Sequence, residues 1–289
     1  MSLYTERHGI RKPIEKTYNI NKEVYNILFN CCEKYKKNLT HIFTLNCHHD
    51  FTNSNYITFD EKGFISRIKI KIPSLFQNKY DQFAILDYIE FFAQKIQDIS
   101  ENWNNPQYKN FQRIECFNTS KIFNNFQKEI DEIFCESGLL YKLTNKKIIE
   151  RIVNNTPLSL EIENSINSFS EVGTKNLLKD AITLYKTPYP SARQDSVEKI
   201  WDALERLKTY YIDLDKKAST EKIIKNIGYN DSEFMELFNE EFKKLTYIGN
   251  NFRIRHHETN KKDIIDPRYY DYLFNRCLSL IAFTIQYLN

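Results

Sequence analysis

One stretch near the carboxyl end of the chain concentrates residues that can do chemistry on phosphate. Residues 243–262 hold six cations against one acid, Glu258, and they include the run Arg253-Ile-Arg-His-His257. Histidine can move a proton near neutral pH. Arginine can hold a phosphate by two parallel hydrogen bonds and stabilise charge in a transition state. This combination can cleave a phosphodiester without a metal ion.

The local conformation decides which of these side chains meet. In a helix, Arg253 and His257 are four residues apart and project from one face, whereas Arg255 and His256 point elsewhere. In a loop, all four can converge. A third interpretation assigns no chemistry: the stretch is then a solvated basic connection between helices, with His257 and Glu258 as a surface pair.

Helical periodicity fills the chain from Ser159 to its end. Six glycines and seven prolines in 289 residues favour long helices and argue against an all-β sandwich. Gly249 directly precedes the basic stretch, which predicts a break that ends one helix there. Starts of the capping type are predicted at Ser191 and Asn230, and Asp266-Pro267 places proline in a first turn. The predicted helices lie near 159–170, 174–186, 192–213, 220–227, 232–248 and 267–288.

The residues before Pro157 mix helical and strand patterns. Irregular chain is predicted for residues 1–20 and a loop for 40–53. Ile68, Ile70 and Ile72 alternate with lysines, which predicts a β-hairpin. Three helices are predicted: one that begins after Asn21, one over 80–101, and one over 119–137 that ends before Gly138. Two hairpins are predicted, which pair 55–59 with 64–72 and 139–143 with 147–153.

Together these patterns predict a mainly α protein. A small α+β domain with a β-hairpin or small sheet, residues 1–157, is followed by an all-α helical bundle, residues 158–289. The net charge of +3 is too small for the whole surface to bind nucleic acid, so a basic site is local. The charged start, the lack of an apolar stretch of about 20 residues and the absence of CxxC predict a cytoplasmic protein with reduced thiols and no membrane contact.

Three segments of the second domain resemble the HEPN superfamily of helical domains, which is common in prokaryotic defence and toxin–antitoxin systems. They are 191–208 as a first long helix, 249–258 as the Arg/His motif region, and 270–276 as the start of a closing helix. The amino-terminal part resembles AbiJ-type abortive-infection proteins at 4–13, Tyr-Thr-Glu-Arg-His-Gly-Ile-Arg-Lys-Pro, and at 134–141.

The resemblance implies an anti-phage effector that cleaves RNA, such as tRNA or mRNA, with no metal or other cofactor. Active members work as dimers whose Arg and His meet across the interface. The 2′-hydroxyl attacks the adjacent phosphate, His assists proton transfer and Arg binds the phosphate. Carried over, the catalytic candidates are Arg253, His257, His256 and Arg255, and the supporting or RNA-binding candidates are Asn250, Asn251, Glu205, Lys208, Lys261 and Lys262.

The spacing in this chain departs from the family motif. There, four to six residues separate Arg from His; here three lie between Arg253 and His257, and none between Arg255 and His256. Two alternatives therefore stay open. The chain is a non-catalytic RNA- or protein-binding regulatory subunit of a defence or toxin–antitoxin system, or an inhibitory or sensor subunit that works with a partner protein from the same operon.

Glu198, Asp202 and Glu205 share one face of the predicted helix 192–213. With Lys208 they either line the HEPN-type site or form a solvated stripe with an intrahelical pair worth about 0.2–0.5 kcal/mol.

Two other clusters have ligand-type or motif residues. One cluster consists of residue types that bind zinc: Cys47, His48, His49 and Asp50, with Cys31, Cys32 or His41. The paired spacing of zinc sites is missing, so no metal is predicted. Cys31 is predicted to be a core residue. The amino-terminal signature 6–9, Glu-Arg-His-Gly, is either a binding or catalytic element or a structural one in which Gly9 permits a turn.

Overall fold

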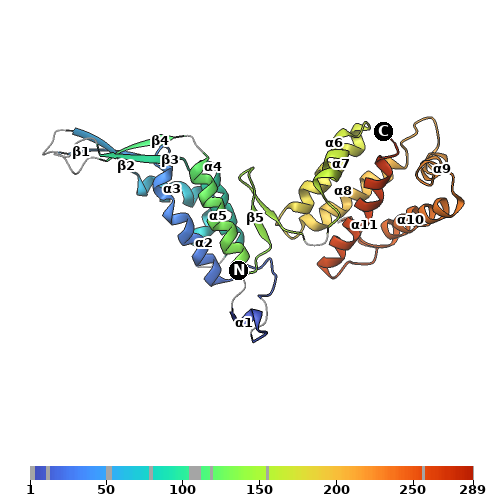
Figure 1. The fold of residues 1–289 in the computed structure, drawn as a ribbon, viewed down its shortest axis with the longest axis horizontal. Coiled ribbons are helices and arrows are strands. Elements are labelled where there is room, and N and C mark those ends of the chain that lie inside the picture. Colours follow the sequence, from blue (N-terminus) through green and yellow to red (C-terminus); the bar gives the residue numbers. More distant parts are fainter. Residues whose placement is uncertain are drawn as a thin grey trace. The chain divides into compact units, whose positions relative to one another are not determined.

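The computed structural model describes residues 4–10, 14–49, 54–77, 81–103, 112–117, 120–153, 156–255 and 258–288. The chain forms two compact units, residues 1–152 and 153–289 (Figure 1). It is mainly helical with small two-stranded sheets, as predicted. No helix in the described ranges is both long and apolar enough to cross a bilayer.

The first unit combines helices with three antiparallel strand pairs. Its helices are α1 (Tyr4–Arg7), α2 (Lys22–Lys34), α3 (Glu61–Lys71), α4 (Gln82–Lys95) and α5 (Lys121–Glu136), with 3₁₀ turns at Lys36–Leu39 and Pro73–Phe76. Its strands are β1 (Thr44–His49), β2 (Ser54–Phe59), β3 (Asp98–Trp103), β4 (Gln112–Phe117), β5 (Tyr141–Leu143) and β6 (Ile149–Arg151).

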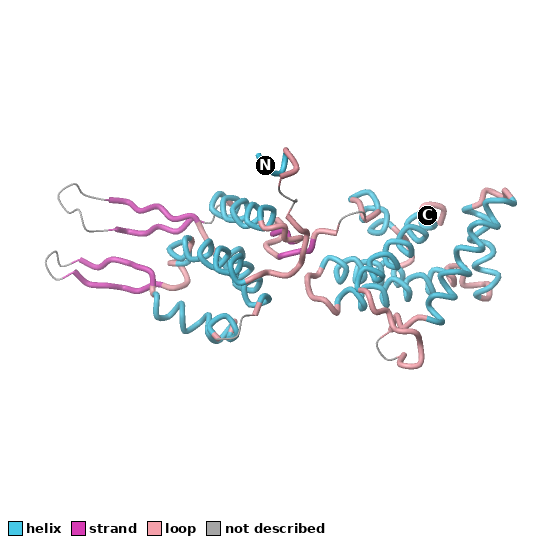
Figure 2. Tube along the Cα trace, turned by 90° about the horizontal axis from the view of Figure 1, so that it is seen from below, coloured by secondary structure: helices cyan, strands magenta, loops and turns pink. Residues whose placement is uncertain are grey.

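The core of the first unit lies between α2, α4 and α5. Leu28, Ile89, Phe92 and Phe126 have no exposed surface, and the last two rings stack with their centroids 6.2 Å apart. The pairs β1–β2 and β3–β4 extend from one end of these helices, with β2 beside β4 (Figure 2). The predicted short hairpin β5–β6 is confirmed, and so is the end of α5 before Gly138, whose φ is +73°.

The predicted hairpin of 55–59 with 64–72 is wrong, because residues 61–71 form α3 and β2 pairs with β1 instead. The Asp60 carboxylate accepts the backbone N–H of Gly63 at 2.9 Å and caps the helix. Phe64, Ile68 and Ile72 are buried at a spacing of four, whereas Ile70 is 75% exposed. The alternation of isoleucine and lysine over residues 68–72 therefore resembles a strand, although residues 61–71 form a helix with one buried face.

Three other local predictions also fail in part. Residues 44–49 of the predicted loop form β1, and α4 ends at Lys95 because residues 98–103 form β3. The irregular start contains the short helix α1. Each error concerns a short element whose strand pairing or capping is decided by tertiary contacts.

The helical assignment of 61–71 predicts unequal effects of two isoleucine substitutions. I68A removes a fully buried side chain and should lower the free energy of unfolding by about 2–5 kcal/mol. I70A, at an exposed position, should change it by less than about 0.5 kcal/mol. Urea unfolding of the full chain followed by circular dichroism measures both. Equal losses would contradict the helix, because a strand would place both side chains on one face.

The second unit contains the six predicted helices, although the one predicted for 192–213 ends at Leu207. They are α6 (Leu160–Ser168), α7 (Val172–Lys186), α8 (Ala192–Leu207), α9 (Lys216–Ile227), α10 (Ser232–Asn251) and α11 (Pro267–Ile285). The predicted start at Asp266-Pro267 is confirmed, since the Asp266 carboxylate accepts the N–H of Arg268 at 2.9 Å. The cap of α10 is Asp231 rather than Asn230, and Ser191 makes no side-chain cap bond.

Helix α8 lies at the centre of the second unit, against α7 and α11. Glu171 ties α7 to α8: its carboxylate caps α7 by accepting the N–H groups of Gly173 and Thr174, and it pairs with Arg206 at 2.9 Å. Burial raises the pKa of Glu171, but the hydrogen bonds from Arg206, Thr174 and Gly173 outweigh it and lower the pKa to about 2.

This carboxylate should make the second unit sensitive to acid. Because its pKa is depressed from 4.5, its stabilising effect is complete above about pH 4.5 and is lost as the pH falls toward 2. E171Q should lower the free energy of unfolding at pH 7 by about 1 kcal/mol, since Arg206 is half exposed. Denaturant unfolding at several pH values measures this. E236Q, at an exposed glutamate on α10, is the control. A difference from wild type that stays constant down to pH 2 would contradict the assignment.

Candidate active site

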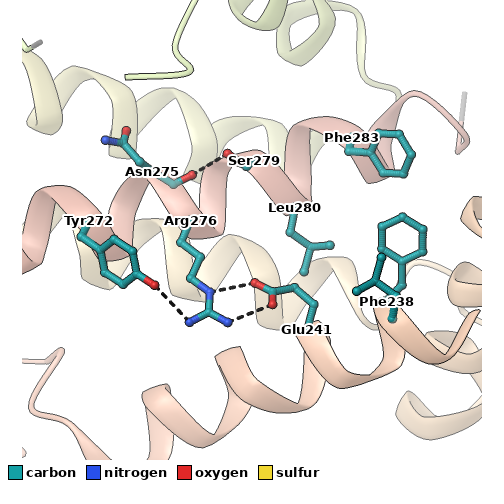
Figure 3. A pocket seen from close by; sticks show the side chains of 9 residues that line it. Phe238, Glu241, Tyr272, Asn275, Arg276, Ser279, Leu280 and Phe283 are labelled. Carbon is teal, nitrogen blue, oxygen red and sulfur yellow. Dashed lines mark hydrogen bonds and ion pairs between the residues drawn. The ribbon is translucent and has the colours of Figure 1, made fainter. Parts of the chain in front are cut away.

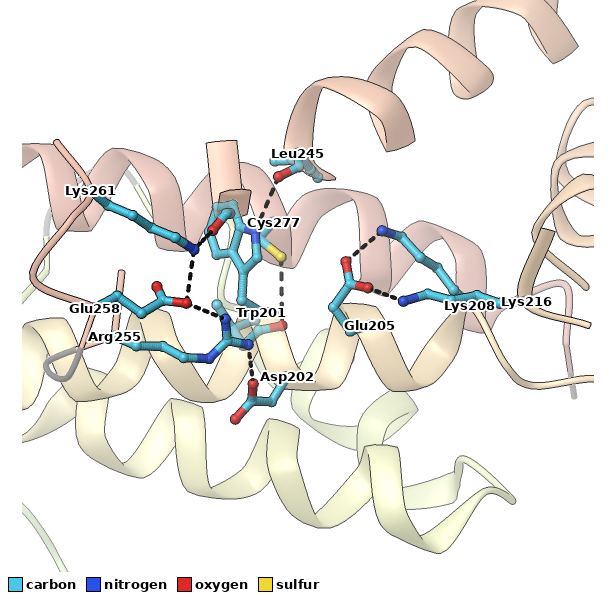
Figure 4. Close-up of polar contacts among 12 residues, drawn as sticks. Trp201, Asp202, Glu205, Lys208, Lys216, Leu245, Arg255, Glu258, Lys261 and Cys277 are labelled. Carbon is cyan, nitrogen blue, oxygen red and sulfur yellow. Dashed lines mark hydrogen bonds and ion pairs between the residues drawn. The ribbon is translucent and has the colours of Figure 1, made fainter. Parts of the chain in front are cut away.

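A buried tryptophan of α8 contacts α10, the helix that leads into the basic stretch. Trp201 of α8 is 1% exposed, and its indole Nε1 donates a hydrogen bond to the carbonyl of Leu245 in α10, at 3.1 Å (Figure 4). A Cβ atom at Gly249 would lie 2.7 Å from this Nε1. The absence of a side chain at Gly249 therefore permits the close approach of α10 to the indole.

The predicted helix break at Gly249 is wrong. Helix α10 continues through Gly249 to Asn251, and a loop then returns along it. The N–H of Arg253 donates to the carbonyl of Lys262 at 2.8 Å, and the N–H of Lys262 donates to the carbonyl of Asn251 at 3.0 Å. We name residues 252–262 the basic loop. Its two ends are pinned together, so Arg253 and Arg255 lie on a closed loop and not on a helix face.

Arg255 is held by two carboxylates. Its Nη2 donates to Oδ1 of Asp202 on α8 at 2.6 Å, and its Nη1 lies 3.6 Å from Oε1 of Glu258 (Figure 4). Burial lowers the pKa of Arg255, but the hydrogen bond to Asp202 and the nearby acids outweigh it and raise the pKa. Lys261 closes the network by donating to Glu258 at 2.8 Å and to the carbonyl of Gly249 at 3.0 Å.

Arg253 has a different environment. Its Nη1 pairs with Asp263 at 3.0 Å, and the side chains are 32% and 69% exposed. Ile254 between the two arginines is fully buried, and the amide of Gln194 donates to the carbonyls of Arg253 and Ile254 at 3.4 and 3.3 Å. Gln194 thus ties the loop to α8 at the buried isoleucine, with one arginine on each side of Ile254 along the chain.

The remaining predicted residues of this region divide between the loop and its surroundings. His256 and His257 lie outside the described residues. Asn250 is exposed, and the amide of Asn251 donates to the carbonyl of Tyr247 at 2.8 Å. Lys262 lies over the ring of Phe252, with Nζ 5.6 Å from its centroid.

Glu205 and Lys208 belong to a second polar cluster on the other side of Trp201 (Figure 4). The Glu205 carboxylate pairs with Lys208 through one oxygen and with Lys216 of α9 through the other. Lys208 is only 4% exposed and also bonds Thr246 of α10. Burial raises the pKa of Glu205, but the two lysines outweigh it and lower the pKa. Asp202 and Glu205 are therefore not a solvated stripe, because both are ion-paired to other elements.

Of the carboxylates that hold the arginines, the sequence singled out Asp202, but it indicated neither Glu258 nor Asp263 as an arginine partner. Glu258 is predicted only as a surface partner of His257, and Asp263 is not among the predicted site residues; the charge balance of 243–262 is the signal that points to pairing of Glu258 with its basic neighbours. The sequence also showed no sign of a hollow of about 580 Å³ between α10 and α11. Phe238, Leu280 and Phe283 line it, and Arg276 beside them binds both oxygens of Glu241, at 2.8 and 2.9 Å (Figure 3).

The described residues contain no group of three or more metal-ligating side chains. Cys47 and His48 are adjacent in β1, so their side chains point to opposite faces. The predicted core position of Cys31 is confirmed; it is 2% exposed, and burial together with Glu129 raises its thiol pKa to about 12. In the signature 6–9, Gly9 has a φ of +67° after the end of α1, as a turn requires.

The contact between Gly249 and Trp201 predicts the effect of one added methyl group. G249A should lower the free energy of unfolding by about 1–3 kcal/mol, because the buried indole must shift. N250A, at the next and exposed position of α10, is the matched control and should have little effect. Denaturant unfolding measures both. A G249A protein more stable than wild type, as helix propensity alone predicts, would show that the two helices do not meet in this way.

Comparison with known proteins identifies the amino-terminal part of the chain. The family described as AbiJ N-terminal domain 4 matches residues 2–168, more than half of the 289 residues. The match covers the first unit and extends through α6 of the second. No curated protein and no solved structure matches the chain. The chain belongs to the AbiJ N-terminal domain 4 family.

Proposed function

We propose that the protein is an anti-phage effector of abortive infection that cleaves RNA without a metal ion at the basic loop of its second unit. Membership of the AbiJ N-terminal domain 4 family supports the role in abortive-infection defence. The helical second unit and the arginines and histidines of the loop support a HEPN-type ribonuclease.

The closure of the basic loop is the observation that carries this proposal. Two backbone hydrogen bonds join its ends, which supports the convergent arrangement over the helical one. In a closed loop, Arg253 and Arg255 can bind the same phosphodiester. His256 and His257 follow Arg255 directly in the sequence.

The chemistry that we assign is a transesterification within RNA. A histidine accepts the proton of a ribose 2′-hydroxyl, whose oxygen attacks the adjacent phosphorus. The bond from phosphorus to the 5′ oxygen breaks, and a protonated histidine supplies the proton to that leaving oxygen. The arginines stabilise the charge on the non-bridging oxygens. The products are a 2′,3′-cyclic phosphate and a 5′-hydroxyl.

The active form that we propose is a homodimer. One chain supplies one Arg/His cluster, and a two-fold interface can bring two clusters together. The substrate class is RNA, such as tRNA or mRNA.

The ion pairs of the arginines favour a second candidate function. Arg255 is held by Asp202 and Glu258, and Arg253 by Asp263, so a phosphate must compete with carboxylates for both. In this alternative the chain is a non-catalytic subunit that binds RNA or a partner protein from the same defence operon. It would bind RNA in a salt-dependent manner and form no cleavage product.

A cleavage assay with chelator present tests the proposal. The purified full chain should cut tRNA or mRNA in EDTA, and H257A and R253A should each lower the rate at least about 100-fold. R268A, which removes an arginine outside the basic loop, is the matched control and should cut at the wild-type rate.

Two results would count against a ribonuclease. One is RNA left intact by wild type under every activating condition, with cellular toxicity that R253A does not relieve. The other is equal activity of R253A, H257A and R268A. Salt-dependent RNA binding without cleavage would support the non-catalytic subunit instead.

A further inference from the structure

A lysine-lined hollow of about 700 Å³ lies between α9, α10 and the C-terminal end of α8. Four lysines from three segments border it: Lys208, Lys216, Lys217 and Lys243. The one acidic side chain that lines it is Glu221. The hollow is separate from the basic loop, because the Glu205 cluster at its edge and the Arg255 cluster lie on opposite sides of Trp201 (Figure 4).

The carboxylates near the hollow do not balance its lysines. Glu205 alone serves both Lys208 and Lys216. Lys243 pairs only with Glu240, at 3.2 Å, and both side chains are about two-thirds exposed, so this pair holds its charge weakly. No carboxylate among the described residues pairs with Lys217. With Glu221 also in the lining, the four lysines face three carboxylates, Glu205, Glu221 and Glu240, so the hollow carries a small excess of positive charge.

The position of two of these lysines in α9 adds to that charge. Lys216 and Lys217 are the first two residues of α9, where the helix dipole favours anions and disfavours cations. Cations at this end weaken the helix; Glu205 compensates Lys216, whereas Lys217 has no carboxylate partner among the described residues. An anion there would meet both the ammonium groups and the positive end of the helix.

The remaining lining groups fit a phosphorylated organic molecule. The amide of Asn239 can donate hydrogen bonds, and the largely buried Phe242 and Ile224 form an apolar floor. A volume of about 700 Å³ lies within the range of small-ligand sites. Lys208, 4% exposed, supplies a fixed ammonium held by Glu205 and Thr246.

We propose that this hollow is a binding site for a phosphate group, carried by a nucleotide or by the end of an RNA strand. The phosphate oxygens replace part of the Glu205 interaction with Lys208 and Lys216 and recruit Lys217 and Lys243 from the rim. This site does not depend on the proposed ribonuclease activity, because binding needs no group of the basic loop.

Isothermal titration calorimetry of the full chain tests the site. The probes are pyrophosphate, ATP, and a short RNA with and without a 5′-phosphate. The variant K217A/K243A removes two exposed rim lysines. K225A/K244A is the matched control, because it removes two exposed lysines from the same helices, α9 and α10, outside the hollow.

We expect saturable binding of pyrophosphate or ATP to wild type, weakened at least about tenfold in K217A/K243A and less than about twofold in K225A/K244A. ATP binding without RNA binding would make a free nucleotide the source of the phosphate, and dependence on the 5′-phosphate would make it an RNA end. The proposal is overturned if neither pyrophosphate, ATP nor the 5′-phosphorylated RNA binds, or if both double variants lose affinity equally.

Pyrophosphate binding is read without any RNA cleavage. A chain that fails to cut RNA but binds pyrophosphate through Lys217 and Lys243 would therefore lose the proposed ribonuclease function and keep this site. The converse result, cleavage without phosphate binding, would remove the site alone.

Discussion

The arrangement of the second unit depends on the contact between one indole and one glycine. Trp201 is buried in α8, reaches the backbone of α10 through its hydrogen bond to Leu245, and lies where a Cβ of Gly249 would have to be. Helices normally cross at 8–10 Å, with the distance set by the side chains at the contact. Here the tryptophan fixes that distance, so the polar side chains on either side of it are positioned as well.

Two charged clusters follow from this contact. On one side, Asp202 reaches Arg255 in the basic loop; on the other, Glu205 reaches Lys208 and Lys216. Asp202 and Glu205 stand three residues apart on α8, so both clusters share one rigid helix. A phosphate at either cluster must displace a carboxylate from a cation. The pairs of Arg255 with Asp202 and of Lys216 with Glu205 are partly exposed and contribute little net free energy, so a phosphate can displace the carboxylate there more easily than at the buried Lys208.

The sequence predicted the second unit better than the first for a physical reason. Helices α6 to α11 have long apolar periods and local caps such as Asp266, so short-range signals suffice to find them. In the first unit, Ile68, Ile70 and Ile72 fit a strand period, and Phe64, Ile68 and Ile72 fit a helical face as well. Only the cap of Asp60 on Gly63 distinguished them. The β1 strand depends on pairing with β2, which no local pattern indicates.

The candidate site was located by residue type, but its geometry was not predictable. Arg253 and Arg255 were found by their charge, whereas the ion pairs with Asp202, Glu258 and Asp263 depend on how the loop folds back. Gly249 was expected to end a helix, but it lies within α10 and permits the contact with Trp201. Close approach of a backbone to a ring leaves no periodic signal in a single sequence.

The chemical identity of the RNA ends tests the central claim most directly. RNA incubated with the full chain in EDTA should carry 2′,3′-cyclic phosphate and 5′-hydroxyl ends, detected by mass spectrometry of the fragments, because the nucleophile is the ribose 2′-oxygen. Fragments with 5′-phosphate and 3′-hydroxyl ends, or cleavage that requires an added divalent metal, would contradict the account.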